Sequence, residues 1–112
     1  NLEPSVLQLR WQVTLNVAGQ ALYAAVPCLL WNGTDQTELR FDGPQVRATL
    51  AGRTWQLTIL NGDGQPWPGQ WFLTPYRSTL STSGVTGRLL MPLGQPTEAG
   101  QQIEWLLRIE SV

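Results

Sequence analysis

The side chains most able to do chemistry in this sequence are eight carboxylates and one thiol, because the chain has no histidine. Without histidine, neither a Ser-His-Asp nor a Cys-His catalytic group can form. Hydrolysis of a glycoside needs two carboxylates facing one cleft, and Asp35 and Asp63 are a candidate pair. Both acids, like Asp42, fall in Gly-rich turns, where a carboxylate is expected to stabilise the local backbone. The sequence therefore favours a protein that is not an enzyme.

The same residue types argue against a metal ion or a cofactor. Asn61, Asp63 and Gln65 alternate like part of a calcium loop, but calcium sites use several carboxylates and this segment has one. Cys28, the only cysteine, lies in the apolar run AAVPCLLW. It is expected to be a small buried hydrophobe, with an intermolecular disulfide or a reactive thiol as alternatives. No metal and no cofactor is predicted.

Aromatic rings are the second group of candidate functional residues. Trp67 and Trp71 flank a turn in the stretch NGDGQPWPGQW, whose glycines and prolines exclude a helix or a regular strand. An indole on a rigid loop can stack on a sugar ring or anchor a partner protein. Tyr76 and Arg77 follow on the next connection, so the sequence predicts an exposed binding patch made of Trp67, Trp71, Tyr76 and Arg77.

The charge of the chain limits the partners that it can have. Its net charge is −1, and its seven basic residues are arginines spread along the sequence. Because they form no basic stripe, nucleic acid and an anionic membrane surface are not expected partners. No apolar run approaches the ~18 residues that span a bilayer. Only 13% of the residues are charged, so uncharged hydrogen-bonding side chains dominate the polar surface.

Alternation with a period of two predicts the elements that carry these residues. The clearest case is a long strand over 7–17 in which every second residue is apolar, giving it one buried face. Trp11, Trp55 and Trp105 are in phase with aliphatic residues and are expected in the core. The apolar positions of the first strand are Leu7, Leu9, Trp11, Val13, Leu15 and Val17. Further strands are predicted at 21–31, 37–41, 46–50, 55–59, 70–75, 89–93 and 103–109.

These strands predict one all-β domain over 1–112, either an antiparallel, immunoglobulin-like β-sandwich of seven to eight strands or a small barrel. Short connections exclude crossover helices, so the strands must be antiparallel. Pro27 marks an edge position or a bulge in the second strand. The turn at 18–20 is placed to fold the first strand back on the second as a hairpin, and donation of that strand to a neighbouring subunit is the alternative.

The segment TWQLTILNGDGQPWPGQWFLTP, followed by TSGVTGRLLMPL, resembles transthyretin-like and carboxypeptidase-regulatory-like β-sandwich domains. The turn pattern of those domains is matched by Asp63, Gly64, Pro66 and Gly69, and their later Thr and Gly by Thr82 and Gly87. The chain departs from them at 83–85, where an acidic residue is usual. The resemblance covers roughly 55–93 and implies a spacer, adaptor or recognition module. It also implies that Leu89 and Met91 point inward.

Two functions follow as hypotheses. The first is a noncatalytic structural or adaptor module of an extracellular or cell-envelope assembly, such as a filament or appendage subunit. It would associate with itself or with a protein partner by strand pairing and aromatic anchors, because a low-charge sheet edge has little to block pairing. The alternative is a carbohydrate-binding module that uses the Trp and Tyr patch on a glycan.

Overall fold

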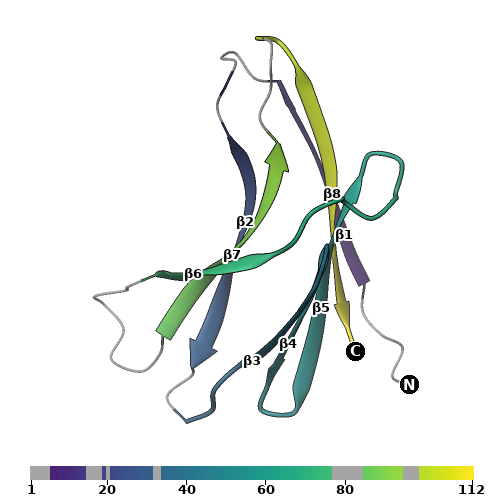
Figure 1. The fold of residues 1–112 in the computed structure, drawn as a ribbon. Helices are drawn as coiled ribbons and strands as arrows, with labels where there is room; N and C mark the ends of the chain where they lie inside the picture. Colours follow the sequence, from purple (N-terminus) through teal and green to yellow (C-terminus); the bar gives the residue numbers. More distant parts are fainter. Residues whose placement is uncertain (1–5, 15–18, 20, 32–33, 77–84, 95–98) are drawn as a thin grey trace.

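The computed structural model describes residues 6–14, 19, 21–31, 34–76, 85–94 and 99–112. This part of the chain folds into two antiparallel sheets without a helix, which confirms the predicted all-β sandwich (Figure 1). The larger sheet has the order β1-β8-β5-β4-β3, and the smaller sheet has the order β2-β7-β6. The strands are β1 (Val6–Thr14), β2 (Leu22–Trp31), β3 (Glu38–Asp42), β4 (Gln45–Leu50), β5 (Arg53–Asn61), β6 (Phe72–Tyr76), β7 (Val85–Gly94) and β8 (Gln102–Ser111).

Strand register decides which side chains form the core. Residues paired across an antiparallel ladder point to the same face of the sheet, and Val46 pairs with Leu57, which pairs with Ile109. These positions define the inner face of the larger sheet, which packs on the smaller one. The buried core cluster comprises Ala24, Val46, Leu57, Ile59, Trp71, Leu89, Met91, Leu93, Trp105 and Leu107. Leu89 and Met91 are therefore inward-facing, as expected.

The first strand does not form the expected hairpin with the second. β1 pairs over its whole length with β8, from Val6 opposite Glu110 to Thr14 opposite Gln102, while β2 pairs with β7 in the other sheet. The hairpin prediction is wrong because the connection between β1 and β2 passes from one sheet to the other. Local sequence specifies a turn, whereas packing of the two apolar faces decides which strands pair.

Glycines in the segment that carries the family resemblance have the predicted roles. Gly64 adopts a φ of 83°, a conformation that strains residues with a side chain. A Cβ at Gly69 would lie 3.0 Å from Met91 Sδ, and one at Gly87 would lie 2.9 Å from Leu73 Cδ1. A side chain would intrude at both positions, as the sequence predicts.

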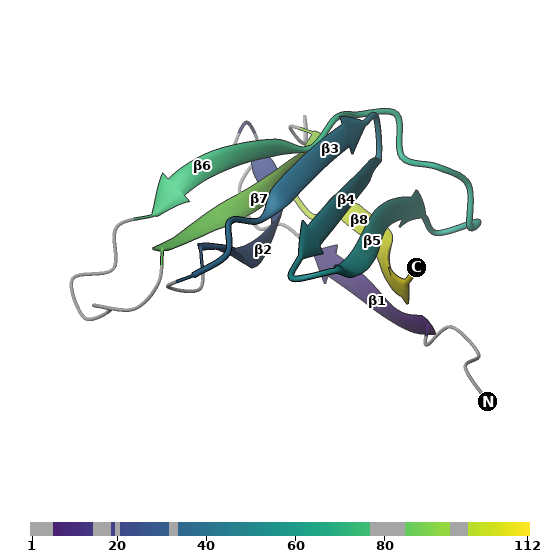
Figure 2. The ribbon, with the colours of Figure 1, turned by 90° about the horizontal axis from the view of Figure 1, so that it is seen from below.

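The two layers are unequal, and this leaves part of the larger sheet uncovered. Figure 2 shows β6 on the same side as β3, whereas β1 lies at the opposite margin of the larger sheet. Most of β1 is exposed: of its nine residues, only Val13 is partly buried. The three-stranded layer is too narrow to cover a five-stranded one, so the open side of the sandwich lies at β1.

Candidate interaction surface

The segment 61–71, which predicts exposed indoles, is a crossing connection between the two sheets. Its first half stays beside β5, because Trp67 N donates to Ile59 O and Asn61 N donates to Gln65 O. Its second half ends on the β3–β4 turn, where Trp71 Nε1 donates to Pro44 O at 2.8 Å. Trp71 is only 3% exposed and belongs to the core. The prediction that Trp71 is an exposed anchor is wrong.

Trp67 is held in a similar way. Its ring is partly buried against the core, and its Nε1 donates to Pro92 O of β7 at 3.0 Å. Each indole thus joins the connection to a neighbouring element through a hydrogen bond. The backbone between them is largely exposed, whereas the two rings turn toward the protein, where these hydrogen bonds hold them.

The described members of the predicted aromatic patch do not form an exposed pair of rings. Two of its four members, Trp67 and Trp71, are packed against the core. Tyr76 ends β6, but its side chain lies outside the described part of the structure, and Arg77 lies outside the described residues. The structure gives no set of exposed, coplanar rings at this loop.

The candidate carboxylate pair is separated by the topology of the larger sheet. Asp35 lies just before β3 and Asp63 just after β5, and these strands run parallel because β4 lies antiparallel between them. The start of one and the end of the other are therefore at opposite ends of the sheet, about 30 Å apart for a nine-residue β5. These two acids do not share a cleft.

The loop that resembles part of a calcium site is stabilised by hydrogen bonds between the side chain of Asn61 and the backbone of the same loop. Asn61 Oδ1 accepts hydrogen bonds from Asp63 N at 2.9 Å and from Gln65 N at 3.0 Å. Among the described residues, no group of three or more Cys, Asp and Glu side chains is placed to hold a metal ion.

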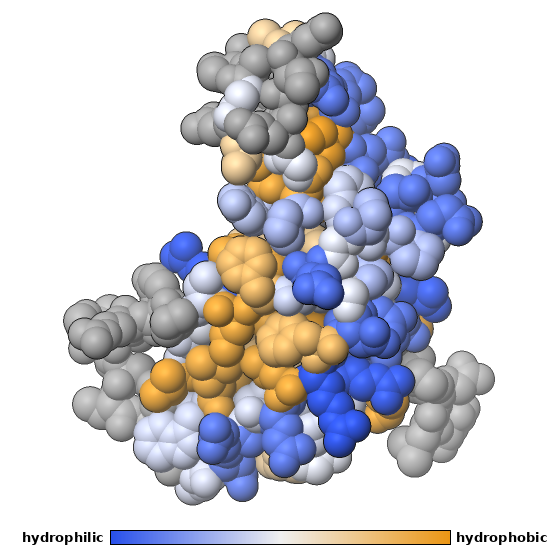
Figure 3. All heavy atoms as spheres, in the orientation of Figure 1, coloured by the Kyte–Doolittle hydropathy of each residue, from blue (hydrophilic) through white to orange (hydrophobic). Residues whose placement is uncertain are grey.

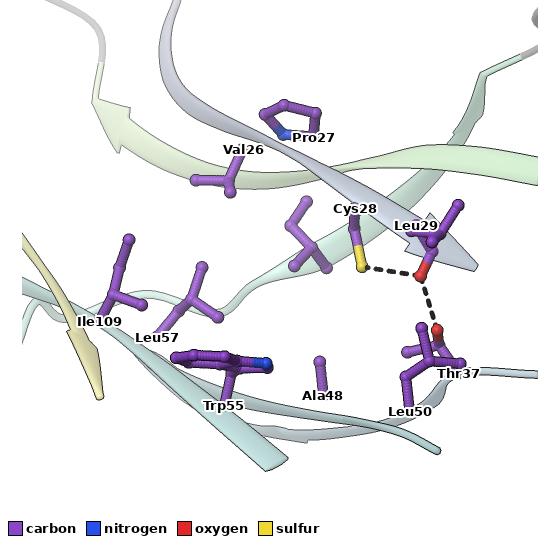
Figure 4. A pocket seen from close by; sticks show the side chains of 11 residues that line it. Val26, Pro27, Cys28, Leu29, Thr37, Ala48, Leu50, Trp55, Leu57 and Ile109 are labelled. Carbon is purple, nitrogen blue, oxygen red and sulfur yellow. Dashed lines mark hydrogen bonds between the residues drawn. The ribbon is translucent and has the colours of Figure 1, made fainter. Parts of the chain in front are cut away.

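Cys28 borders an apolar cavity of about 280 Å³ between the two sheets (Figure 4). The cavity lies between β2 and the inner face of the larger sheet, where Trp55, Leu57 and Ile109 face it. Cys28 is half-buried, so it is less enclosed than predicted. Its Sγ lies 3.7 Å from Leu29 O, and burial raises the pKa of the thiol. The site has one polar lining side chain, Thr37.

We expect the Cys28 thiol to react slowly in the folded protein, because the raised pKa leaves less thiolate at neutral pH. Alkylation by N-ethylmaleimide at pH 7.5, followed by mass spectrometry, should be several-fold slower for the folded chain than for the chain in denaturant. A folded chain that reacts as fast as the denatured one would contradict this expectation. The Cys28→Ser variant shows the background rate.

Each sheet has two edges, and three of the four carry a feature that hinders pairing with another strand. β3 is five residues long and has three charged residues, and β6 and β2 contain Pro75 and Pro27. The C-terminal end of β2 is also occupied, since Thr37 donates from N to Leu30 O and from Oγ1 to Leu29 O. Pro27 thus lies on an edge strand, as predicted. Short length, charge and proline all block edge pairing.

β1 is the edge without such a feature. It extends over nine residues, contains neither proline nor glycine, and has one charged residue, Arg10. That charge is already matched, because Arg10 Nη1 forms an ion pair with Glu104 Oε1 of β8. Among the described residues no strand pairs with the outer side of β1. A long, nearly neutral edge of this kind is a site for strand addition.

The apolar face of β1 lies next to this edge. Leu7, Leu9 and Trp11 pair with residues of β8 that point to the inner face, yet they are 53%, 39% and 38% exposed. Trp11 stacks on buried Trp105 with ring centroids 5.8 Å apart and an interplanar angle of 13°. We call these three side chains the β1 stripe. Val13 continues the face and is partly buried.

Two of the three tryptophans predicted to be buried are therefore partly exposed. Trp105 is in the core, but Trp11 and Trp55 are 38% and 43% exposed. Their side chains have the predicted orientation toward the inner face. The prediction fails because the smaller sheet covers neither position fully: Trp11 lies on the edge strand β1, and Trp55 lies near the start of the central strand β5. Leu15 and Val17, the last two positions of the predicted pairing strand, lie outside the described residues.

Apolar side chains are also exposed away from the β1 stripe. In the space-filling view, a band of hydrophobic residues runs down the middle of the face shown (Figure 3). Tyr23 and Phe72, from the two edge strands of the smaller sheet, are exposed and form an edge-to-face ring pair with centroids 6.1 Å apart. Such scattered exposure is common in small sandwiches, and neither ring adjoins an unobstructed backbone edge.

Comparison of the chain with known protein families, curated proteins and solved structures gives no match. No helix in the described part of the chain is long and apolar enough to cross a membrane. The function must therefore be inferred from the surface itself. Sequence reasoning identified the residues of β1 but not their exposure, and the signal for the open edge was present: β1 has neither proline nor glycine and only one charge.

Proposed function

We propose that this chain is a noncatalytic structural or adaptor module of an extracellular or cell-envelope assembly, and that it associates by β-strand pairing along β1. The observation that carries the proposal is the long, unblocked edge of β1 beside the exposed β1 stripe. An added strand gains backbone hydrogen bonds from such an edge, and side chains at alternate positions provide specificity.

Trp11 is the aromatic anchor in this proposal. Its ring lies against buried Trp105, which holds it in place before a partner arrives. Aromatic residues lose little conformational entropy on binding and dominate interface energies. Trp11 thus takes the role that the sequence assigned to Trp67 and Trp71.

The extracellular or cell-envelope setting comes from the sequence. A surface with little charge and many uncharged hydrogen-bonding groups suits contacts with other proteins, and filaments outside the cell use strand addition to hold subunits together. A carbohydrate-binding role has no comparable support, because the two tryptophans that suggested it are packed against the core.

The proposal predicts that the protein associates and that changes on β1 abolish the association. Sedimentation velocity from 5 μM to 500 μM should show a mass that rises with concentration. The Leu7→Lys/Leu9→Lys variant should remain monomeric, because lysines at an edge strand oppose pairing. Both side chains are more than one third exposed, so the fold should tolerate the change.

The matched control is Phe41→Lys. Phe41 lies on the inner face of β3, the other edge of the larger sheet, and is 46% exposed. This variant should associate like the wild type. A wild-type protein that stays monomeric throughout, or a lysine effect that is equal on β3 and β1, would contradict the proposal.

A further inference from the structure

We infer that the partner of β1 is β1 of a second copy of this chain, paired antiparallel about a two-fold axis through Leu9. This inference rests on the proposed function and specifies its partner. This pairing joins the five-stranded sheets of the two copies into one continuous sheet across their β1 edges. The argument uses the alternation of β1, its single charge and the exposure of its apolar residues.

Alternation restricts the possible registers. In β1 the odd-numbered residues point to the inner face and the even-numbered ones point outward, as their partners on β8 show. Paired residues share a face, so apolar positions of one copy must oppose apolar positions of the other. A two-fold axis must therefore pass through a residue pair and not between residues, and only a few centres are available.

The charge of Arg10 excludes one of these centres. A two-fold axis through Arg10 would place the guanidinium groups of both copies opposite each other, and like charges directly opposed destabilise a strand pair. An axis through Leu9 places Arg10 opposite Gln8 of the second copy, where an amide oxygen can accept a hydrogen bond. Arg10 also keeps its ion pair with Glu104 of its own copy.

Exposure selects among the remaining centres. The Leu9 centre sets Leu7 opposite Trp11 of the second copy and Leu9 opposite its own equivalent, so that each of the six side chains of the two β1 stripes lies opposite one from the other stripe. A centre at Trp11 would instead set Leu9 opposite Val13, which is partly buried. A centre at Gln8 would set Leu7 opposite Leu9 but would give Trp11 no counterpart from the stripe.

The area involved indicates the strength of the dimer. At 53%, 39% and 38% exposure, the β1 stripe presents on the order of 250 Å² per copy. Stable interfaces bury about 800 Å² per partner. The stripe and one strand ladder therefore give a weak, reversible dimer, which is why the measurement must reach high concentration.

The register can be tested by disulfide crosslinking, since Cys28 is the only cysteine and can be removed. In a Cys28→Ala background, Leu9→Cys should form a disulfide dimer quickly under mild oxidation, because directly opposed residues have Cα atoms about 4.5–5.5 Å apart. Leu7→Cys alone should not, since its two copies are offset by four residues, about 13 Å. A mixture of Leu7→Cys and Trp11→Cys chains should crosslink to each other.

A charge change at Gln8 tests the same register without crosslinking. Gln8→Glu should tighten the dimer roughly 2- to 10-fold, because two Glu–Arg10 pairs form per dimer. Gln8→Lys should weaken it by a similar factor, because it opposes Arg10 of the second copy. Dissociation constants from sedimentation equilibrium give both values, and each variant is first shown to fold by its circular dichroism spectrum.

Association that is sensitive to Leu7→Lys/Leu9→Lys but insensitive to charge at Gln8, or without a Leu9→Cys crosslink, would overturn the Leu9-centred pairing and leave the proposed function standing. A wild-type chain that never associates would remove both. Crosslinking of Leu7→Cys alone, at the rate of Leu9→Cys, would show random collision and would also overturn the register.

Discussion

Replacing Trp71 by alanine should destabilise the protein by about 3–5 kcal/mol, the range for truncating a large buried aromatic side chain. Trp71 is 3% exposed, belongs to the core cluster and donates from Nε1 to Pro44 O. Its removal leaves a cavity and takes one of two hydrogen bonds from Pro44 O, which still accepts from Ile59 N. Urea denaturation followed by circular dichroism measures the free energy of unfolding.

Trp31→Ala is the matched control for this measurement. Trp31 is the last residue of β2 and is 39% exposed. Its truncation should cost less than that of Trp71, because a much larger part of its surface is already in contact with water. Equal losses for the two variants would show that Trp71 is not the core residue that the structure describes.

The second large effect is expected at Gly87, where valine should destabilise the protein by about 1–3 kcal/mol through overpacking. A Cβ there would lie 2.9 Å from Leu73 Cδ1, 3.1 Å from Leu30 Cδ1 and 3.2 Å from Thr74 O. The two leucines can turn away, but the carbonyl belongs to the β6 backbone, so β6 and β7 must separate locally. The same denaturation experiment measures the loss.

Thr86→Val provides the control at the neighbouring position of β7. It is also β-branched and nearly unchanged in volume, so it should alter the free energy of unfolding by less than about 0.5 kcal/mol. A Gly87→Val variant as stable as Thr86→Val would show that the space at Gly87 is larger than described.

The sequence predicted the elements better than their arrangement. Alternation located all eight strands, because period two follows directly from strand geometry. It could not show that β1 pairs with β8, since the paired residues are between 88 (Thr14 and Gln102) and 104 (Val6 and Glu110) positions apart in the sequence. Such long-range pairing is decided by packing between layers and leaves no local signal at the turn.

The candidate site was predicted in part. The apolar positions of β1 were identified as a pairing strand, and the structure places Leu7, Leu9 and Trp11 beside an open edge. The aromatic patch failed for a physical reason: glycine and proline show that a segment is irregular but not which side of it faces solvent. Trp67 and Trp71 looked exposed because loops usually are.

The pairing of β1 with β8 has a mechanical consequence. Val6 lies opposite Glu110, so the first and last strands begin and end at the same end of the sheet. Force that pulls these two ends apart would break the hydrogen bonds of the ladder one after another. Each step would therefore need little force. Force along a joint between two β1 strands, paired antiparallel about a two-fold axis, would instead load all its hydrogen bonds together, so the joint would part by shear and not bond by bond.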